Sequence, residues 1–199
     1  GSSRGPRHPR GMAAWASVLL SGLAGERVLV GAAPKGLLTQ TEFFEATWDV
    51  VNLDAATSEG KWGVLAGWDV SGVGDFSYVF SVYRDKAGSF EEAGNTNAAT
   101  FVGVGLESWN TTAITTLEAT FSRASSMNAD LGTWDVSKVV SLYGTFYDAS
   151  KFNGKGLDKW NTTAATTLKA TFAGARSMNV DVGKWNVAKV VSLSNTFQD

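Results

Sequence analysis

Apolar residues recur at a fixed interval through the second half of the chain. Trp109, Trp134, Trp160 and Trp185 are separated by 25, 26 and 25 residues. Two other apolar columns keep this spacing: Phe121, Phe146, Phe172 and Phe197, and Leu117, Leu142, Leu168 and Leu193. A period of roughly 20 to 50 residues shared by several columns is typical of stacked coils. The sequence therefore predicts a repeat array.

Each repeat contains two hydrophobic patterns. Leu131, Trp134, Val136 and Val139 follow the pattern L-x-x-W-x-V-x-x-V, which resembles the strand segment of a leucine-rich repeat. Beyond Val139, apolar residues at 142, 146 and 149 continue with spacings of 3, 4 and 3, as on one helical face. We therefore expect each coil to be a short strand followed by about three turns of helix, with the strands of stacked coils forming one parallel sheet.

A further unit lies upstream of these four repeats. The segment LAGWDVSGVGDFSYVF (65–80) matches 131–146 at its Leu, Trp, Asp, Val, Ser and Phe positions. Because 41 residues separate Trp68 from Trp109, the first coil carries an insertion, which we place at 81–100. Counted from the coil of Trp109 as number one, odd coils read WNTT and even coils read WDVS or WNVA, which indicates duplication of a two-coil unit.

The asparagine column at Asn128, Asn153 and Asn179 precedes the predicted strands. A repeated asparagine at a turn can hydrogen-bond the unpaired backbone groups of neighbouring turns. The sequence therefore predicts an internal asparagine ladder.

The segment MNADLGTWDVSKVVSLYGTFYDASKFNGKGLDKWNTT (127–163) resembles the BspA-like leucine-rich repeats of surface and secreted proteins. The shared features are W-[DN]-x-[ST], then V-x-x-[ML]-x-x-x-F, then A-x-x-[FM]-N. The resemblance covers about residues 62–199 and departs from the family at the insertion, in the Thr-rich odd coils and at Val102. It implies an α/β solenoid, a right-handed leucine-rich-repeat-like array of about five coils of short parallel strands and helices.

The region before the repeats, residues 36–61, is predicted to hold a capping helix. Thr39 and Glu42 fit a capping box at the start of TQTEFFEATWDVVNL (39–53). Phe44, Trp48 and Val51 follow at helical spacing, which predicts one apolar face covering the first coil. The sequence ends two residues after a TF pair, so we also expect another element or a partner to cover the last coil.

Residues 1–35 form a basic and apolar arm with a balance of +4, within a net charge of −2 for the whole chain. Three interpretations stay open: a packed arm or cap, a targeting remnant, and a membrane attachment through residues 11–33. The overall charge gives no reason to expect nucleic acid as a partner. We expect an extracytoplasmic location, at the surface or secreted, or an organellar membrane-associated one.

The residue types present exclude several kinds of catalytic site. The chain has no cysteine and one histidine, His8, which lies in the arm. Thiol nucleophiles and thiolate metal sites are therefore excluded, and we expect no enzyme, no cofactor and no metal. Asp130 and Asp181 recur at equivalent positions, which favours a turn-capping role over paired-carboxylate catalysis.

A polar face is predicted beside the tryptophan column. If the tryptophans are core, as the cost of exposing them indicates, the residues on either side point outward. The insertion adds varied chemistry, and long insertions often carry specificity. The candidate partner-binding residues are Asp69, Ser71, Asn110, Thr112, Asp135, Ser137, Lys159, Asn161, Thr163, Lys184 and Asn186 on the face, with Tyr83, Arg84 and Phe90 in the insertion.

The function that these features predict is non-catalytic. We expect a protein–protein interaction or scaffold module that binds other protein chains through the predicted sheet face, the insertion and the arm. The alternative is an accessory structural subunit of a larger protein assembly, including a membrane-associated one. Carbohydrate or ice binding by the threonines, and a hydrated face that binds nothing, are the remaining interpretations.

Overall fold

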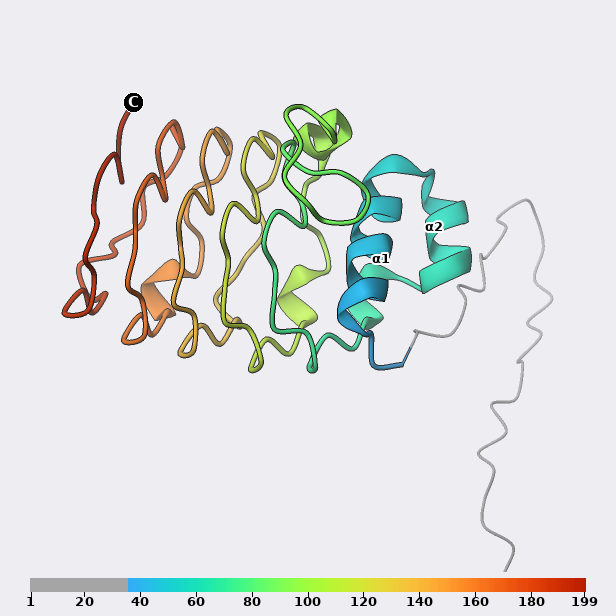
Figure 1. The fold of residues 1–199 in the computed structure, drawn as a ribbon, viewed down its shortest axis with the longest axis horizontal. Helices are drawn as coiled ribbons and strands as arrows, with labels where there is room; N and C mark the ends of the chain where they lie inside the picture. Colours follow the sequence, from blue (N-terminus) through green and yellow to red (C-terminus); the bar gives the residue numbers. More distant parts are fainter. Residues whose placement is uncertain (1–35) are drawn as a thin grey trace, which may run out of the picture. The chain divides into compact units, whose positions relative to one another are not determined.

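The computed structural model describes residues 36–199. Two α-helices, α1 (Gln40–Asn52) and α2 (Ala55–Trp62), begin this part, and the coils follow one behind another (Figure 1). Four short 3-10 helices lie in the coils and the insertion: η1 (Leu65–Gly67), η2 (Thr96–Thr100), η3 (Leu106–Ser108) and η4 (Leu157–Lys159). None of the helices in this part is long and apolar enough to cross a membrane. Segment 11–33 lies outside the described residues.

Equivalent residues of successive coils lie opposite one another. A column of parallel bridges joins Asp75 to Thr116, Thr116 to Ser141, Ser141 to Thr167 and Thr167 to Ser192. From Thr116 onward, these residues are 25, 26 and 25 positions apart. The sequence period is therefore the period of the stack.

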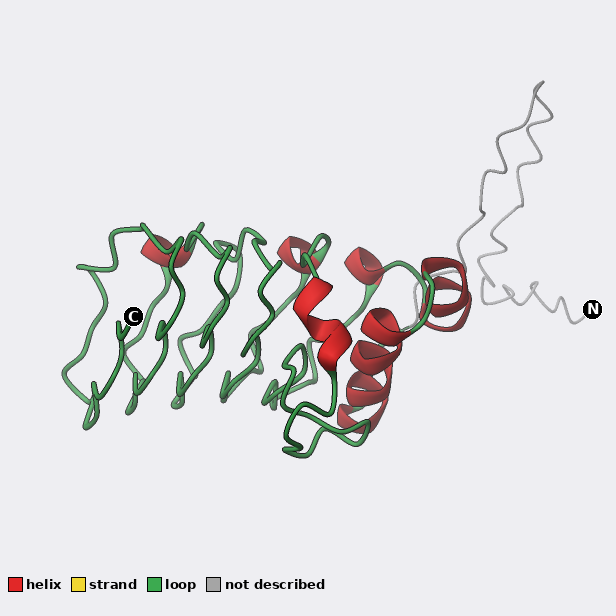
Figure 2. Ribbon diagram, turned by 90° about the horizontal axis from the view of Figure 1, so that it is seen from above, coloured by secondary structure: helices red, strands yellow, loops and turns green. Residues whose placement is uncertain are grey.

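The prediction of an α/β solenoid built from parallel strands and helices is wrong. Across residues 36–199 no segment forms a strand, and Figure 2 shows the coils mainly as loops with short helical turns. Each contact between coils in the bridged column is a single isolated bridge. Both α-helices precede the coils, which contain turns and 3-10 helices.

The predicted strand is replaced by turns that side chains stabilise. In the coil that contains Trp134, the Asp135 carboxylate accepts the N–H of Ser137 at 2.9 Å. The Val136 carbonyl then accepts the N–H of Val139, also at 2.9 Å. Side-chain bonds of this kind compete with extended structure. The chain therefore bends directly after the tryptophan and cannot continue as a strand.

The predicted helix is replaced by bonds between coils. Ala119 and Phe121 donate their N–H groups to the carbonyls of Tyr143 and Thr145 in the next coil, at 2.8 and 2.9 Å. The N–H of Ser122, the residue after Phe121, instead donates to the Ala119 carbonyl in its own coil at 3.1 Å. In an α-helix, each N–H bonds the carbonyl four residues earlier in the chain. Because alternate N–H groups here bond carbonyls of the next coil, this segment cannot be an α-helix.

The five tryptophans of the column are core residues, as predicted. Each is at most 8 % exposed: Trp68, Trp109, Trp134, Trp160 and Trp185. Each indole N–H also donates to the backbone carbonyl of a residue that lies earlier in the chain. Trp134 bonds the carbonyl of Leu106, and Trp160 bonds that of Leu131, both at 2.9 Å. The indole rings therefore fill the core and tie neighbouring coils together.

A buried threonine column makes a second set of ties. The Thr145 hydroxyl donates to the Leu117 carbonyl of the preceding coil at 2.9 Å, and Thr171 bonds that of Leu142 at the same distance. These threonines precede the phenylalanines whose rings stack along the core, such as Phe121 on Phe146 at 5.7 Å. Because the hydroxyls are satisfied, a polar column can lie in the interior.

The capping box and the first helix are confirmed. The Thr39 hydroxyl accepts the N–H of Glu42 at 3.3 Å, and the Glu42 carboxylate accepts the N–H of Thr39 at 3.1 Å. The buried face of α1 differs from the predicted one. Phe43 and Ala46 are buried, and the Phe43 ring centroid lies 4.5 Å from that of Phe76 in the first coil. The predicted Phe44 is half-buried, as are Trp48 and Val51.

The asparagine ladder is present as one side-chain contact. The Asn128 side-chain oxygen accepts the backbone N–H of Asn153 in the next coil at 3.1 Å. The Asn153 side chain instead accepts the N–H of Lys155 in its own coil at 3.0 Å. Asn179 continues the column through its backbone, donating to the Asn153 carbonyl at 3.1 Å.

Candidate binding surface

The polar columns predicted to form a sheet face lie at exposed turns. In every coil, the Asp or Asn that follows the tryptophan accepts the backbone N–H two residues on. Asp69 accepts from Ser71 and Asn110 from Thr112, at 3.0 and 3.3 Å. The same contact is made in the later coils by Asp135 with Ser137, Asn161 with Thr163, and Asn186 with Ala188. These oxygens therefore shape the turns.

The two aspartates of this column are held in the ionised form. The Ser71 hydroxyl and N–H lower the pKa of Asp69, and the Ser137 side chain and N–H lower that of Asp135. Lys159 and Lys184, from the neighbouring column, are exposed. The predicted face is thus largely exposed, and much of its hydrogen-bonding capacity is used within its own turns.

Arg84 does not belong to a surface, contrary to the prediction. Its side chain is 0 % exposed. The guanidinium donates to the carbonyls of Phe44 and Val79, each at 2.7 Å, and to the Thr47 hydroxyl at 2.9 Å. Burial lowers the pKa of Arg84 to about 10, so the group stays charged at neutral pH. Arg84 therefore fastens the insertion to α1 and the first coil.

The other two candidates in the insertion line an aromatic hollow. Phe90 is 63 % exposed, and its ring centroid lies 6.0 Å from that of Tyr83 and 6.0 Å from that of Tyr78. The hollow has a volume of about 330 Å³. We call it the aromatic trough, and its main lining residues are Tyr78, Tyr83, Phe90, Ala119, Tyr143, Gly144, Tyr147, Lys169 and Ala170.

The floor of the aromatic trough is a column of small residues in the left-handed conformation. Ala119, Gly144 and Ala170 have φ angles of 49°, 58° and 54°. Their N–H groups bond the next coil, as in Gly144 to the Lys169 carbonyl at 3.0 Å. At the equivalent position in the last coil, Asn195 has a φ of 59°. The floor is therefore fixed by contacts between coils.

The walls of the aromatic trough carry hydroxyls and a cation. The ammonium of Lys169 lies 5.5 Å from the centroid of the Tyr143 ring. The Tyr78 hydroxyl donates to the Glu118 carboxylate at 3.2 Å. Burial, followed by the charge of Glu118, raises the pKa of Tyr78 to about 12, so this phenol is neutral at neutral pH. The trough therefore combines aromatic surface with hydrogen-bonding groups.

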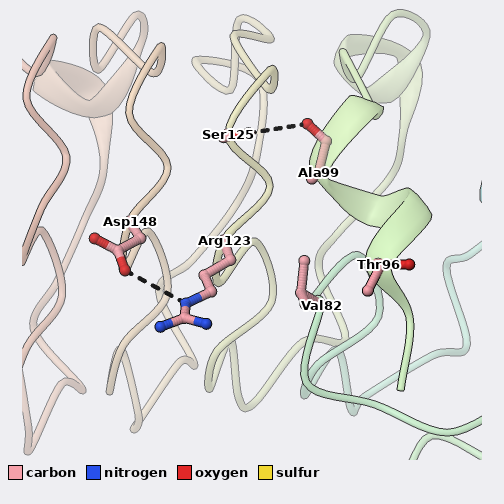
Figure 3. Close-up of a pocket in the computed structure, with 6 residues that line it drawn as sticks. All are labelled: Val82, Thr96, Ala99, Arg123, Ser125 and Asp148. Atoms are coloured by element: carbon pink, nitrogen blue, oxygen red, sulfur yellow. Dashed lines mark hydrogen bonds and ion pairs between the residues drawn. The ribbon is translucent and has the colours of Figure 1, made fainter. Parts of the chain in front are cut away.

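A second hollow is lined by Val82, Thr96, Ala99, Arg123, Ser125 and Asp148 (Figure 3). Arg123 and Asp148 point toward one another from neighbouring coils, with 3.4 Å between Nε and Oδ2. The guanidinium of Arg123 also lies 4.8 Å from the centroid of the Tyr83 ring. Arg123 therefore stands between the two hollows and supports the ring of Tyr83.

The floor of small residues was missed in the sequence, as were four trough residues with an aromatic ring or a charge: Tyr78, Tyr143, Tyr147 and Lys169. The one available signal was variation within a column. Glu118, Tyr143 and Lys169 occupy the same place in successive coils, yet share neither size nor charge. A varied position in an otherwise regular array indicates a surface that does not shape the coil.

The recurring carboxylates cap turns, as predicted. Asp130 accepts the N–H of Gly132 at 2.9 Å, and Asp181 accepts that of Gly183 at 2.8 Å. Bonds from Gly132 and Lys155 lower the pKa of Asp130. Within residues 36–199, no three His, Asp or Glu side chains lie close enough to hold a metal ion.

Comparison with known proteins identifies the family. No curated protein and no solved structure matches the chain. Residues 87–199, more than half of the 199 residues, match the family described as Mycoplasma protein of unknown function, DUF285. The match runs from the middle of the insertion through all the later coils. The chain therefore belongs to the DUF285 family.

Proposed function

We propose that this chain is a non-catalytic module that binds another protein through the aromatic trough. The observation that supports it most strongly is the gathering of exposed rings. Phe90 is 63 % exposed and Tyr143 is 37 % exposed, and they come from the insertion and from a coil distant in sequence. Exposed aromatic side chains around a hollow are typical of protein interfaces, where Tyr and Phe are enriched.

The chemistry of the trough favours recognition over structural support alone. A ring needed only for packing would be buried, as Phe121 and Phe146 are. The trough instead places phenol hydroxyls and the Lys169 ammonium beside apolar surface, a mixture typical of non-obligate interfaces. The resemblance of residues 62–199 to BspA-like repeats implies the same class of function.

The polar columns beside the tryptophans support binding less well. The side-chain oxygens of Asn110 and Asp135 accept backbone hydrogen bonds within the turns of their own coils. Thr112 and Thr163 are exposed, but Ser137 and Ala188 replace them in alternate coils. A regular threonine surface for ice or carbohydrate is therefore interrupted.

Site-specific photocrosslinking tests the proposal. A photoreactive amino acid replaces Tyr143 in one variant and Thr112, on the polar columns, in a matched control. We expect the protein expressed in its native source to crosslink to the same partner protein repeatedly from position 143. Crosslinks from position 112 alone would assign binding to the polar columns, and none from either would contradict the proposal. A partner recovered in constant stoichiometry would indicate an accessory subunit of an assembly.

A further inference from the structure

We infer that Asn110 and Asn161 carry N-linked glycans. Each begins the acceptor pattern for this modification, an asparagine followed two residues later by serine or threonine, in the segments NTT at 110–112 and 161–163. No other asparagine of the chain is followed by serine or threonine at that distance. The inference goes beyond the proposed function, because it concerns the polar columns and not the aromatic trough.

Both patterns lie at exposed turns, which are the usual location of such acceptors. In each, the asparagine and the second threonine are exposed and the middle threonine is buried. In the first pattern the buried Thr111 is fixed to the next coil, because its hydroxyl accepts the N–H of Asp135 at 2.7 Å. The side chains of Asn110 and Thr112 therefore project from a turn that is held from beneath, and a glycan there does not displace the core.

The reacting atom of each asparagine is free. The Oδ1 atom of Asn110 accepts the N–H of Thr112 at 3.3 Å and its hydroxyl at 2.9 Å. The Oδ1 atom of Asn161 accepts the N–H of Thr163 at 3.2 Å. These contacts occupy the oxygen of each side-chain amide. Both Nδ2 atoms make no hydrogen bond to any residue in the range 36–199, so they are available as nucleophiles.

The reaction is a substitution at a sugar carbon. The Nδ2 atom attacks the anomeric carbon of an oligosaccharide that is linked to a polyprenyl diphosphate and bound by a transferase. A C–N bond forms while the C–O bond to the diphosphate breaks, polyprenyl diphosphate leaves, and one Nδ2 proton passes to a base of the transferase. The Thr112 hydroxyl favours loss of this proton, because its hydrogen bond to Asn110 Oδ1 stabilises negative charge on the amide.

The turn itself does not require this pattern. At the equivalent turn of the last coil, Asn186 Oδ1 accepts the N–H of Ala188 at 2.9 Å, although alanine has no hydroxyl. At another, the Asp135 carboxylate accepts the N–H of Ser137 at the same distance. The turn therefore forms without the hydroxyl and without the amide. The odd coils combine both groups, which is what an acceptor site requires.

Glycans at these positions would cover the polar columns. Asn110 and Asn161 are two coils apart, about 10 Å at the usual spacing of bridged chains, with the turn of Asp135 between them. None of the residues that line the aromatic trough belongs to either pattern. The modification is therefore compatible with binding at the trough. It also implies that the chain passes through a compartment that holds such a transferase, as the expected extracytoplasmic location does.

Glycan release from the protein purified from its native source tests the inference. A peptide N-glycosidase in heavy-oxygen water cleaves the bond to Nδ2 and leaves an aspartate labelled with heavy oxygen, which peptide mass spectrometry locates. We expect the label at positions 110 and 161 and at no other asparagine. Unmodified asparagine at both positions would overturn the inference, and so would glycans found on threonine alone.

Reciprocal variants test the role of the hydroxyl. The full chain, behind a cleavable signal peptide, is translated with microsomes, and the number of attached glycans is counted by gel mobility. Wild type is expected to gain two glycans. Thr112→Ala keeps Asn110 but should lose one glycan, whereas Ala188→Thr should add a third, at Asn186. Asn153→Gln, an exposed asparagine outside the pattern, is the control and should leave the number unchanged.

The variants and the native protein decide different points. If Thr112→Ala and wild type gain the same number of glycans, Asn110 is not an acceptor and the inference fails. If the microsomes modify both asparagines but the native protein carries no glycan, the inference also fails. The crosslink from position 143 is independent of either result, so the proposed function and this inference stand or fall separately.

Discussion

The side-chain amide of Gln40 hydrogen-bonds both backbone groups of Asp75. Its Nε2 donates to the Asp75 carbonyl at 2.6 Å, and its Oε1 accepts the Asp75 N–H at 3.1 Å. In the next coil, the equivalent carbonyl of Thr116 accepts the N–H of Phe76 from the coil before it, at 3.2 Å. The glutamine of α1 therefore takes the place that a preceding coil takes elsewhere in the stack.

Replacing Gln40 tests this role of α1. We expect Gln40→Leu to lower the free energy of unfolding by about 1 to 3 kcal/mol, because the backbone groups of Asp75 lose their partners beneath the helix. Equilibrium unfolding in urea measures the change. Thr41→Leu, at the exposed neighbouring position, is the control. An equal loss in both variants would show that the amide contacts contribute nothing specific.

Arg84 should be a large contributor to stability although it lies in the insertion. In Arg84→Met, the carbonyls of Phe44 and Val79 and the hydroxyl of Thr47 lose a charged donor in the interior. We expect a loss of about 3 kcal/mol. Arg84→Lys should also destabilise, since one ammonium cannot reach all these acceptors.

The measurement for Arg84 is chemical unfolding combined with amide hydrogen exchange. Exchange in residues 82–95 should accelerate in the variant more than exchange in the later coils, because the insertion loses its attachment to α1. Arg176→Met, an exposed arginine in a distant coil, is the control and should change neither quantity. Wild-type stability in Arg84→Met would contradict the anchoring role.

Asp49 gives α1 and α2 a pH-dependent connection. The residue is 4 % exposed, and its carboxylate accepts hydrogen bonds from the Lys61 ammonium at 2.7 Å and the Trp62 indole N–H at 2.8 Å. Burial raises the pKa of Asp49, but the hydrogen bonds from Lys61 and Trp62, with nearby positive charge, outweigh burial. Its pKa therefore lies below the usual 3.8.

This shift fixes the sign of the pH dependence. A carboxyl whose pKa is lower in the folded state contributes stability above its unfolded pKa, and that contribution is lost as pH falls through the folded value. The difference in unfolding free energy between wild type and Asp49→Asn should therefore be constant near neutrality and shrink below about pH 4. Urea unfolding at a series of pH values measures it, with the exposed Asp158→Asn as control. A difference that persists down to pH 2 would refute the assignment.

The period and the core could be predicted because hydrophobic columns report burial directly. Trp134 and Phe146 recur at the stack spacing and lie in the interior. The secondary structure could not, since spacings of 3 and 4 suit a helix and also a succession of turns. The choice depends on where N–H groups such as that of Ala119 find acceptors, and its acceptor lies in the next coil, at Tyr143. No local pattern encodes a partner that far along the chain.

The candidate site was predicted in part, for physical reasons that differ between residues. Tyr83 and Phe90 were expected at the surface because they lie in an insertion, and both line the trough. Arg84 was expected there for the same reason, and charged side chains are mostly exposed in proteins. It is buried because carbonyls converge on its guanidinium, which sequence does not reveal. Tyr143 and Lys169 were missed because the repeat columns were identified from the residue types that their members share. The column that contains these two residues shares none.

Thr111 and Val136 occupy the same buried place in successive coils, and their difference gives the two-coil period a physical basis. The Thr111 hydroxyl accepts the N–H of Asp135 in the next coil at 2.7 Å. Two coils later, the hydroxyl of Thr162 donates to the Asn186 carbonyl at 3.1 Å. Valine at this place makes no such bond. Contacts of this type therefore join an odd coil to the even coil that follows it.

The nearly isosteric change Thr111→Val isolates this contact. We expect it to lower the free energy of unfolding by about 1 to 2 kcal/mol, because the Asp135 N–H loses its acceptor while packing is kept. Val136→Thr should also destabilise, since it buries a hydroxyl where the even coils provide valine. Thr163→Val, at an exposed position, should stay within about 0.5 kcal/mol of wild type in the same urea titrations. If Thr111→Val proves as stable as Thr163→Val, the hydroxyl does not join the coils and the alternation of threonine and valine has another cause.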